Sequence, residues 1–84
     1  SPDNEIKSLA IYRKAKILID EGKYEEAHQI LHNSESYQHI ELKGDLYLIQ
    51  KDYVSAMKNY KDVLTFSITP NERKNIISKI NLIK

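Results

Sequence analysis

Two histidines, His28 and His32, have the type and spacing that could bind a metal ion. They lie four residues apart in a stretch with helical periodicity, and two imidazoles placed in this way can hold zinc or nickel. No third ligand lies nearby in the sequence, and the chain contains no cysteine. We therefore expect surface histidines on the outer face of a helix, with no metal and no other cofactor. His39, near the start of the next helix, is expected to be partly packed.

Two pairs of adjacent carboxylates, Asp20-Glu21 and Glu25-Glu26, could in principle perform general acid–base chemistry. Such catalysis needs a cleft with opposed environments that separate the two pKa values. These pairs flank an expected turn, and the second pair suits the positive end of a helix dipole. The sequence also has no Gly-rich phosphate loop and no convincing Ser/His/Asp arrangement. We therefore expect a protein that is not an enzyme and binds no small-molecule substrate.

The length and charge of the chain limit its class. It has 84 residues and a formal net charge of +1, which favours one domain and argues against a nucleic-acid partner. No apolar run approaches the roughly 20 residues of a membrane span, so we expect this piece to be soluble. Residues 1–42 carry eight acidic and five basic side chains, whereas residues 43–84 carry four and eight. This asymmetry indicates either solvated helix surfaces or a polar match between repeats or subunits.

The apolar residues recur at steps of three and four, which predicts helices over residues 4–20, 24–33, 36–49, 53–66 and 70–83. The breaks between them have chemical causes. Gly22 can adopt the left-handed conformation that ends a helix, and Thr69-Pro70 is a typical helix start. Asp52, and either Ser34 or Ser36, can cap the helices that follow them. No segment alternates long enough to form a strand.

An internal repeat accompanies these helices. Residues 22–27 parallel residues 51–56, with a tyrosine three residues before an alanine, and the two alanines are 29 residues apart. Twelve residues before Ala27 and Ala56 stand the small residues Ala15 and Gly44. Two antiparallel helices approach closely where small residues meet, so we expect Ala15 to face Ala27 and Gly44 to face Ala56.

The second unit reads Ile40-x2-Lys43-Gly44-x2-Tyr47, then Ala56-x3-Tyr60, then Pro70. This order resembles the tetratricopeptide repeat (TPR), although lysine replaces the usual leucine before the small residue and the period is shorter than the usual ~34 residues. The resemblance implies an all-α fold: a TPR-like right-handed superhelix of two helical hairpins plus a C-terminal capping helix. We expect one domain over residues 1–84, with repeat 1 at about 8–34, repeat 2 at about 37–69 and the capping helix at 70–84. The buried side of that helix should carry Ile76, Ile77, Ile80 and Ile83.

A narrower resemblance rests on short segments in a fixed order. They are residues 27–31 (AHQIL), 41–45 (ELKGD), the turn at 51–52, Thr69-Pro70, and the ending 79–82 (KINL). Their order and spacing resemble the C-terminal end of YfgM-like proteins, the ancillary subunits of the SecYEG translocon. That resemblance implies a periplasmic domain on the inner membrane, with the translocon, a periplasmic chaperone and exported proteins as partners. Because the chain starts at Ser1 without Met, we expect a piece of a longer protein whose membrane anchor lies upstream.

In TPR arrays the first helix of each unit lines a concave face on which peptides or partner helices dock. The spacing does not match the carboxylate-binding clamp of some TPR proteins. The alternatives for this face are a solvated surface or a face covered by another part of the parent chain. The alternative function is a generic TPR scaffold or an architectural segment of a larger oligomeric protein. The repeat register predicts a partner-binding concave face formed by Tyr12, Lys16 and Ile19 of the first unit and by Gln38, Glu41, Asp45 and Leu48 of the second.

Overall fold

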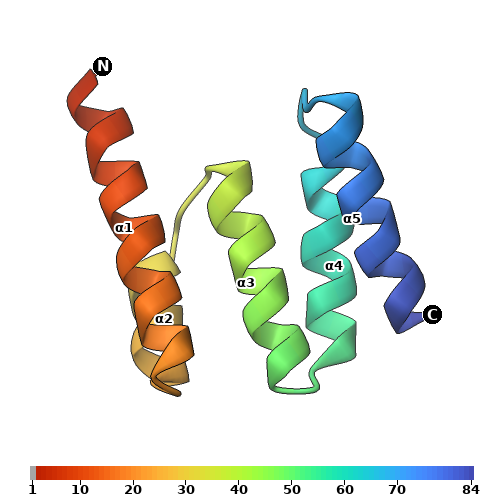
Figure 1. Ribbon diagram of the computed structural model, residues 1–84, viewed down its shortest axis with the longest axis horizontal. Helices are drawn as coiled ribbons and strands as arrows, with labels where there is room; N and C mark the ends of the chain where they lie inside the picture. The colour runs from red at the N-terminus through yellow and green to blue at the C-terminus, as the bar shows by residue number, and fades with distance from the viewer. Residues whose placement is uncertain (1) are drawn as a thin grey trace.

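The protein folds into five α-helices arranged as an array, as seen in a computed structural model that describes residues 2–84 (Figure 1). No strand occurs in this range, so the all-α prediction is confirmed. The last four helices begin within one residue of their predicted starts and the first begins two residues early, whereas the second and fourth end two to three residues early. The helices are α1 (Pro2–Asp20), α2 (Tyr24–Leu31), α3 (Tyr37–Ile49), α4 (Tyr53–Val63) and α5 (Pro70–Ile83).

The helix boundaries follow from local chemistry. Gly22 adopts a φ of 77° after α1, as expected of a left-handed C-terminal residue. Lys51 adopts a similar φ of 63° in the equivalent turn without the steric freedom of glycine. Thr69 and Glu72 form a reciprocal capping box at the start of α5, and Asp52 accepts a hydrogen bond from the Ser55 N–H at the start of α4.

The N-terminus of α3 lacks the serine cap that the sequence predicted. Ser36 occupies the N-cap position, but its hydroxyl makes no capping hydrogen bond. Ser34, the other candidate, directs its hydroxyl to the ring of His39. The loop serine is therefore used to satisfy a buried histidine and not the free N–H groups of the helix.

Two hairpins and a final helix share one continuous packing arrangement. Helix α1 pairs with α2, and α3 pairs with α4, while α3 also contacts the first hairpin and α5 packs on α4. Figure 1 shows α1 and α5 at opposite edges of this array. Its interior is a chain of apolar clusters that runs from Leu18 and Leu31 in the first hairpin to Ile76 and Ile80 in the last helix.

The small residues lie against large side chains of the partner helices. A Cβ atom on Gly44 would lie 2.7 Å from Cε1 of Tyr60, so Gly44 lies against this ring. The first hairpin repeats this arrangement, because Ala15 packs with Leu31, the residue equivalent to Tyr60. Each small residue thus accommodates a large side chain of the partner helix, since a close helix approach leaves no room for two large ones.

The capping helix buries fewer of its isoleucines than predicted. Ile76 and Ile80 are buried against α4, and Ile83 is half-buried. Ile77 is 42% exposed, so its expected burial is wrong. Ile77 lies at the edge of the apolar face of α5, because this face is narrow.

Substitution of Gly44 by Ala tests the helix contact. The new Cβ would overlap the Tyr60 ring, and this ring cannot withdraw easily because its hydroxyl is bonded to Asp45. Overpacking should outweigh the gain in helix propensity, and we expect the free energy of unfolding to fall by about 1–2 kcal/mol in urea titrations followed by circular dichroism. In a Tyr60→Leu background the same substitution should cost less. An equal cost in both backgrounds would contradict the contact.

Candidate partner-binding groove

A groove of about 590 Å³ lies between the N-terminal half of α1 and the first turn of α3. Its apolar floor comes from Leu9, which is 48% exposed, and from the half-buried ring of Tyr12. Polar side chains surround this floor, so the groove can contact both an apolar side chain and a peptide backbone. The lining residues are Asn4, Glu5, Ser8, Leu9, Tyr12, Gln38 and His39.

His39 holds the two walls of the groove together. Its side chain is buried at 3% exposure, and its Nε2 lies 2.8 Å from the Ser8 carbonyl oxygen of α1. A carbonyl only accepts, so Nε2 carries the proton, and the Ser34 hydroxyl donates to Nδ1. The ring also stacks on Tyr12, with centroids 6.5 Å apart. His39 is therefore a positioning residue that joins α1, the α2–α3 loop and α3, and it is more buried than predicted.

The residues predicted from the first unit have separate environments. Tyr12 lines the groove, and the exposed Lys16 places its ammonium 5.7 Å from the centroid of the Tyr12 ring. Ile19 instead packs against the core clusters of the first hairpin. Of these three, Tyr12 and Lys16 are accessible to a partner, and Ile19 mainly supports the fold.

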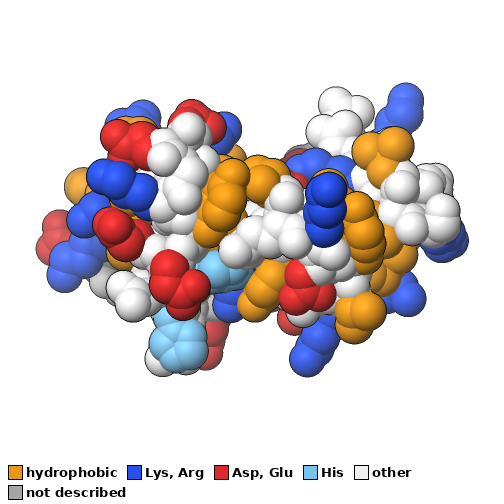
Figure 2. Space-filling model, turned by 90° about the horizontal axis from the view of Figure 1, so that it is seen from below, with side chains coloured by type: hydrophobic (Ala, Val, Ile, Leu, Met, Phe, Trp, Pro, Cys, Tyr) orange, Lys and Arg blue, Asp and Glu red, His pale blue; other side chains and the backbone are white. Residues whose placement is uncertain are grey.

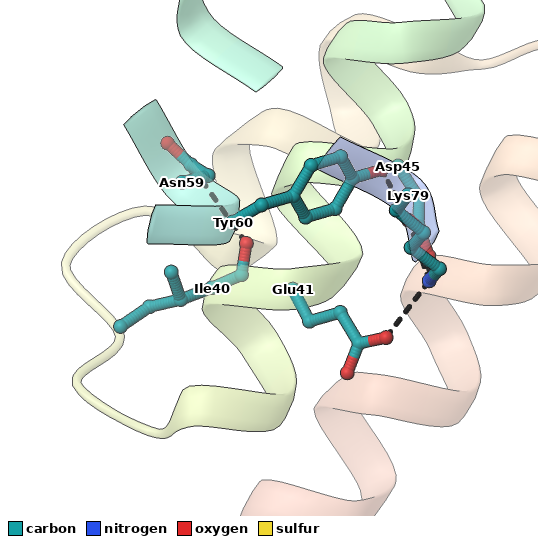
Figure 3. Close-up of polar contacts among 6 residues, drawn as sticks. All are labelled: Ile40, Glu41, Asp45, Asn59, Tyr60 and Lys79. Atoms are coloured by element: carbon teal, nitrogen blue, oxygen red, sulfur yellow. Dashed lines mark hydrogen bonds and ion pairs between the residues drawn. The ribbon is translucent and has the colours of Figure 1, made fainter. Parts of the chain in front are cut away.

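The residues predicted from the second unit are mostly engaged within the chain. Gln38 lines the groove, but Glu41 and Asp45 bind the ammonium of Lys79 from α5, at 2.8 and 2.9 Å (Figure 3). Leu48 packs against the apolar cluster between α4 and α5. The structure therefore brings Tyr12 and Gln38 together and assigns Glu41, Asp45 and Leu48 to contacts that hold the helices.

The decisive comparison is with protein families. The sequence profile of the tetratricopeptide repeat-like domain family matches residues 1–84, which is the whole chain. The chain belongs to this family. No curated protein and no solved structure matches it closely enough to add a relative. TPR-like domains are generally non-catalytic modules that bind other proteins, which agrees with a groove lined by apolar and amide side chains.

The TPR register could have identified the part of the groove that the sequence prediction missed. Ser8 lies four residues before Tyr12, and Asn4 lies four residues before Ser8, so all three share one helix face. Glu5 and Leu9 flank this face. The prediction began at Tyr12 because the repeat match begins near residue 8, although α1 extends by more than a turn before it.

The two histidines of the i, i+4 pair have different environments. His28 is half-buried, donates a 2.8 Å hydrogen bond from Nε2 to Oε1 of Gln50, and contacts the Tyr47 ring, so the prediction of an outer-face position is wrong for this residue. His32 is exposed at the end of α2. Within residues 2–84 no group of three potential metal ligands is assembled.

The charges of the second hairpin form a compact network around Asp45. Its Oδ1 accepts hydrogen bonds from the Tyr60 hydroxyl, at 2.6 Å, and from Lys79 (Figure 3). Burial by itself lowers the pKa of Lys79, but the bonds and charges of Glu41 and Asp45 outweigh this effect and raise it. Burial and the bond to Asp45 also raise the pKa of Tyr60. Both groups are thus stabilised in their protonated forms.

The two ends of the array differ in surface charge. Figure 2 shows Asp and Glu side chains concentrated over the half formed by α1 and α2, whereas Lys and Arg predominate over α4 and α5.

None of the helices in the described part of the chain is long and apolar enough to cross a membrane.

Removal of the Ser34 hydroxyl tests the role of His39. In Ser34→Ala the buried Nδ1 loses its donor, and an unsatisfied buried acceptor typically costs about 1–3 kcal/mol of unfolding free energy. Urea unfolding should show this loss. In a His39→Leu background, which has no acceptor, Ser34→Ala should cost less. If the two costs agree, the hydroxyl does not act through His39.

The Lys79–Tyr60 network predicts a stability loss at alkaline pH. Both groups have raised pKa values in the fold, so their contribution is complete below the unfolded-state values near pH 10 and declines as the pH rises through the folded values. The double variant Lys79→Met/Tyr60→Phe should be less stable at pH 7 and lose less stability between pH 9 and about 11. The control Tyr53→Phe changes an exposed tyrosine and should leave the pH dependence intact. A double variant as pH-sensitive as the parent would refute the assignment.

Proposed function

We propose that this TPR-like domain is a non-enzymatic interaction module that binds a protein segment in the groove between α1 and α3. The exposed apolar floor formed by Leu9 and Tyr12 carries this proposal, because aromatic and aliphatic side chains in a groove supply most of the energy of an interface. An apolar side chain of the partner fits this floor.

Polar groups around the floor suit an extended segment. Gln38 accepts a hydrogen bond from Ser36 through Oε1, which leaves its amide N–H groups directed to no other described residue. These groups can donate to a backbone carbonyl of the partner. Glu5 and Lys16 provide charges of opposite sign near the floor, which favour orientation and association rate more than affinity. Glu41 and Asp45, which already bind Lys79, supply no free charge.

The cellular setting of the proposal is the periplasmic side of the inner membrane. There the domain would be part of an ancillary SecYEG translocon subunit that assists exported proteins together with a periplasmic chaperone. The motif order that resembles the C-terminal end of YfgM-like proteins supports this setting. Two of these motifs contact each other, because Lys79 of the 79–82 segment binds Glu41 and Asp45 of the 41–45 segment. Such a contact gives a structural reason for both motifs to occur in one family.

Site-specific crosslinking tests the groove and its setting. A photoreactive amino acid at Leu9, in the protein expressed in its own cells, should capture a partner that mass spectrometry identifies as a translocon subunit, chaperone or exported protein. The matched control places the same group at Val54, which is 83% exposed on α4 and outside the groove.

Leu9→Asp should weaken partner binding about tenfold or more without lowering Tm by much, since Leu9 is half-exposed.

The outcomes separate the two levels of the proposal. Equal crosslinks from positions 9 and 54 would exclude the groove as the binding site. Crosslinks confined to position 9 with partners from another compartment would retain the groove and reject the translocon setting.

A further inference from the structure

The face of α1 that points away from the array carries an apolar stripe. Ile6 and Ile17 are 67% and 58% exposed, and Ala10 and Arg13 lie exposed between them. The spacing of four, three and four residues places these side chains along one side of the helix. We name Ile6, Ala10, Arg13 and Ile17 the α1 outer stripe. It lies opposite Ala15 and Leu18, which are buried in the first hairpin.

The internal repeat shows what this stripe corresponds to. The residues 29 positions after Ala10, Arg13 and Ile17 are His39, Leu42 and Leu46, all buried in α3. Leu42 packs with Ala15 and Leu31, and Leu46 packs with Leu18 and Ala27. These positions therefore form the surface through which a unit stacks on the hairpin before it. On α1 the same surface has no neighbour within the array.

Helix α5 forms the opposite edge of the array. Ile76 and Ile80, 34 positions after Leu42 and Leu46, provide the same stacking surface on α5 and pack on α4. A repeat array ends in a helix with a polar outer face. The positions on α5 that would receive a hairpin partner, equivalent to Ile40, Gly44 and Tyr47, are the exposed polar residues Lys74, Ser78 and Asn81. The outer side of α5 is thus mainly polar, with Ile77 and Leu82 exposed beside these residues, whereas α1 presents the apolar stripe.

We propose that the α1 outer stripe binds a further amphipathic helix, the second helix of another hairpin, as α2 does for α3 and α4 does for α5. This helix presents small and aliphatic side chains at three- and four-residue spacing toward Ile6, Ala10 and Ile17. It also carries a carboxylate toward Arg13, which makes no ion pair with any described residue. The surface is distinct from the α1–α3 groove and does not depend on the function proposed for it.

The position of Arg13 argues against a second copy of the chain as the occupant. The stripe is centred between residues 11 and 12, so an antiparallel pair of α1 helices would bring the two Arg13 side chains within about one helical turn of each other. Neither stripe offers a carboxylate between its two ends. Like charges at such a distance oppose pairing.

A fusion protein tests the open surface. A copy of residues 36–66, which contains α3 and α4, is joined before Ser1 through a Gly/Ser linker of about eight residues, with a span of roughly 16 Å. If the added α4 copy packs on the stripe, the fusion should unfold in one cooperative thermal transition with a Tm at least about 5 °C above that of the 84-residue chain. In the fusion, Ile6→Gln/Ile17→Gln should abolish this gain. In the 84-residue chain the same double variant should change Tm by less than about 2 °C, because both side chains are largely exposed.

The matched control is Val54→Gln/Leu82→Gln in the original part of the fusion, which changes two other exposed apolar residues and should preserve the gain. Two separate transitions, or an equal Tm gain with and without the stripe isoleucines, would overturn the proposal. Sedimentation of the 84-residue chain over a wide concentration range should show a monomer. A dimer that Ile6→Gln/Ile17→Gln dissociates would assign the stripe to a second copy and reject the helix partner proposed here.

Discussion

The close approach of α3 and α4 at Gly44 is the constraint on which the second hairpin depends. Because residue 44 has no side chain, the Tyr60 ring can lie where a Cβ would be and reach Asp45 with its hydroxyl. Asp45, fixed in this way, accepts from Lys79 and so links α5 to a helix on which it does not pack directly. One missing side chain thus sets the spacing of two helices and the register of a third.

The sequence was sufficient for the helices and their ends, because glycine, proline and capping residues act locally. It also placed the small residues at helix contacts. It did not identify the large side chains that lie against them, Tyr60 at Gly44 and Leu31 at Ala15, because these contacts depend on the rotation of one helix against the other, which no short-range pattern encodes. The Lys79–Asp45 pair spans 34 residues and depends on the crossing of α5 over α4. For the same reason two of the seven predicted groove residues, Tyr12 and Gln38, line the groove, whereas four others hold the fold.

Helix α1 has three different surfaces, and this explains its unusual composition. One surface packs on α2, a second forms the groove with α3, and the third carries the outer stripe. Apolar residues are consequently spread around the helix and not confined to one face. The first two surfaces are expected of a TPR-like domain. The first is the contact between the two helices of a hairpin, and the second belongs to the concave side of the array. The third follows from the repeat register, because Ala10, Arg13 and Ile17 are equivalent to buried residues of α3.

The brevity of α2 has a consequence for the motions of the molecule. Helix α1 has 19 residues, but α2 has only eight, so the first turns of α1 extend beyond the helix that backs them. Hollows lie on both sides of this overhang, and Asn4, Ser8 and His39 line both of them. The overhang is held by few buried apolar contacts and by the buried, hydrogen-bonded ring of His39. Segments with so few buried contacts open locally before the rest of a domain unfolds. We therefore expect the N-terminal turns of α1 that form this groove wall to open at a lower free energy than the second hairpin.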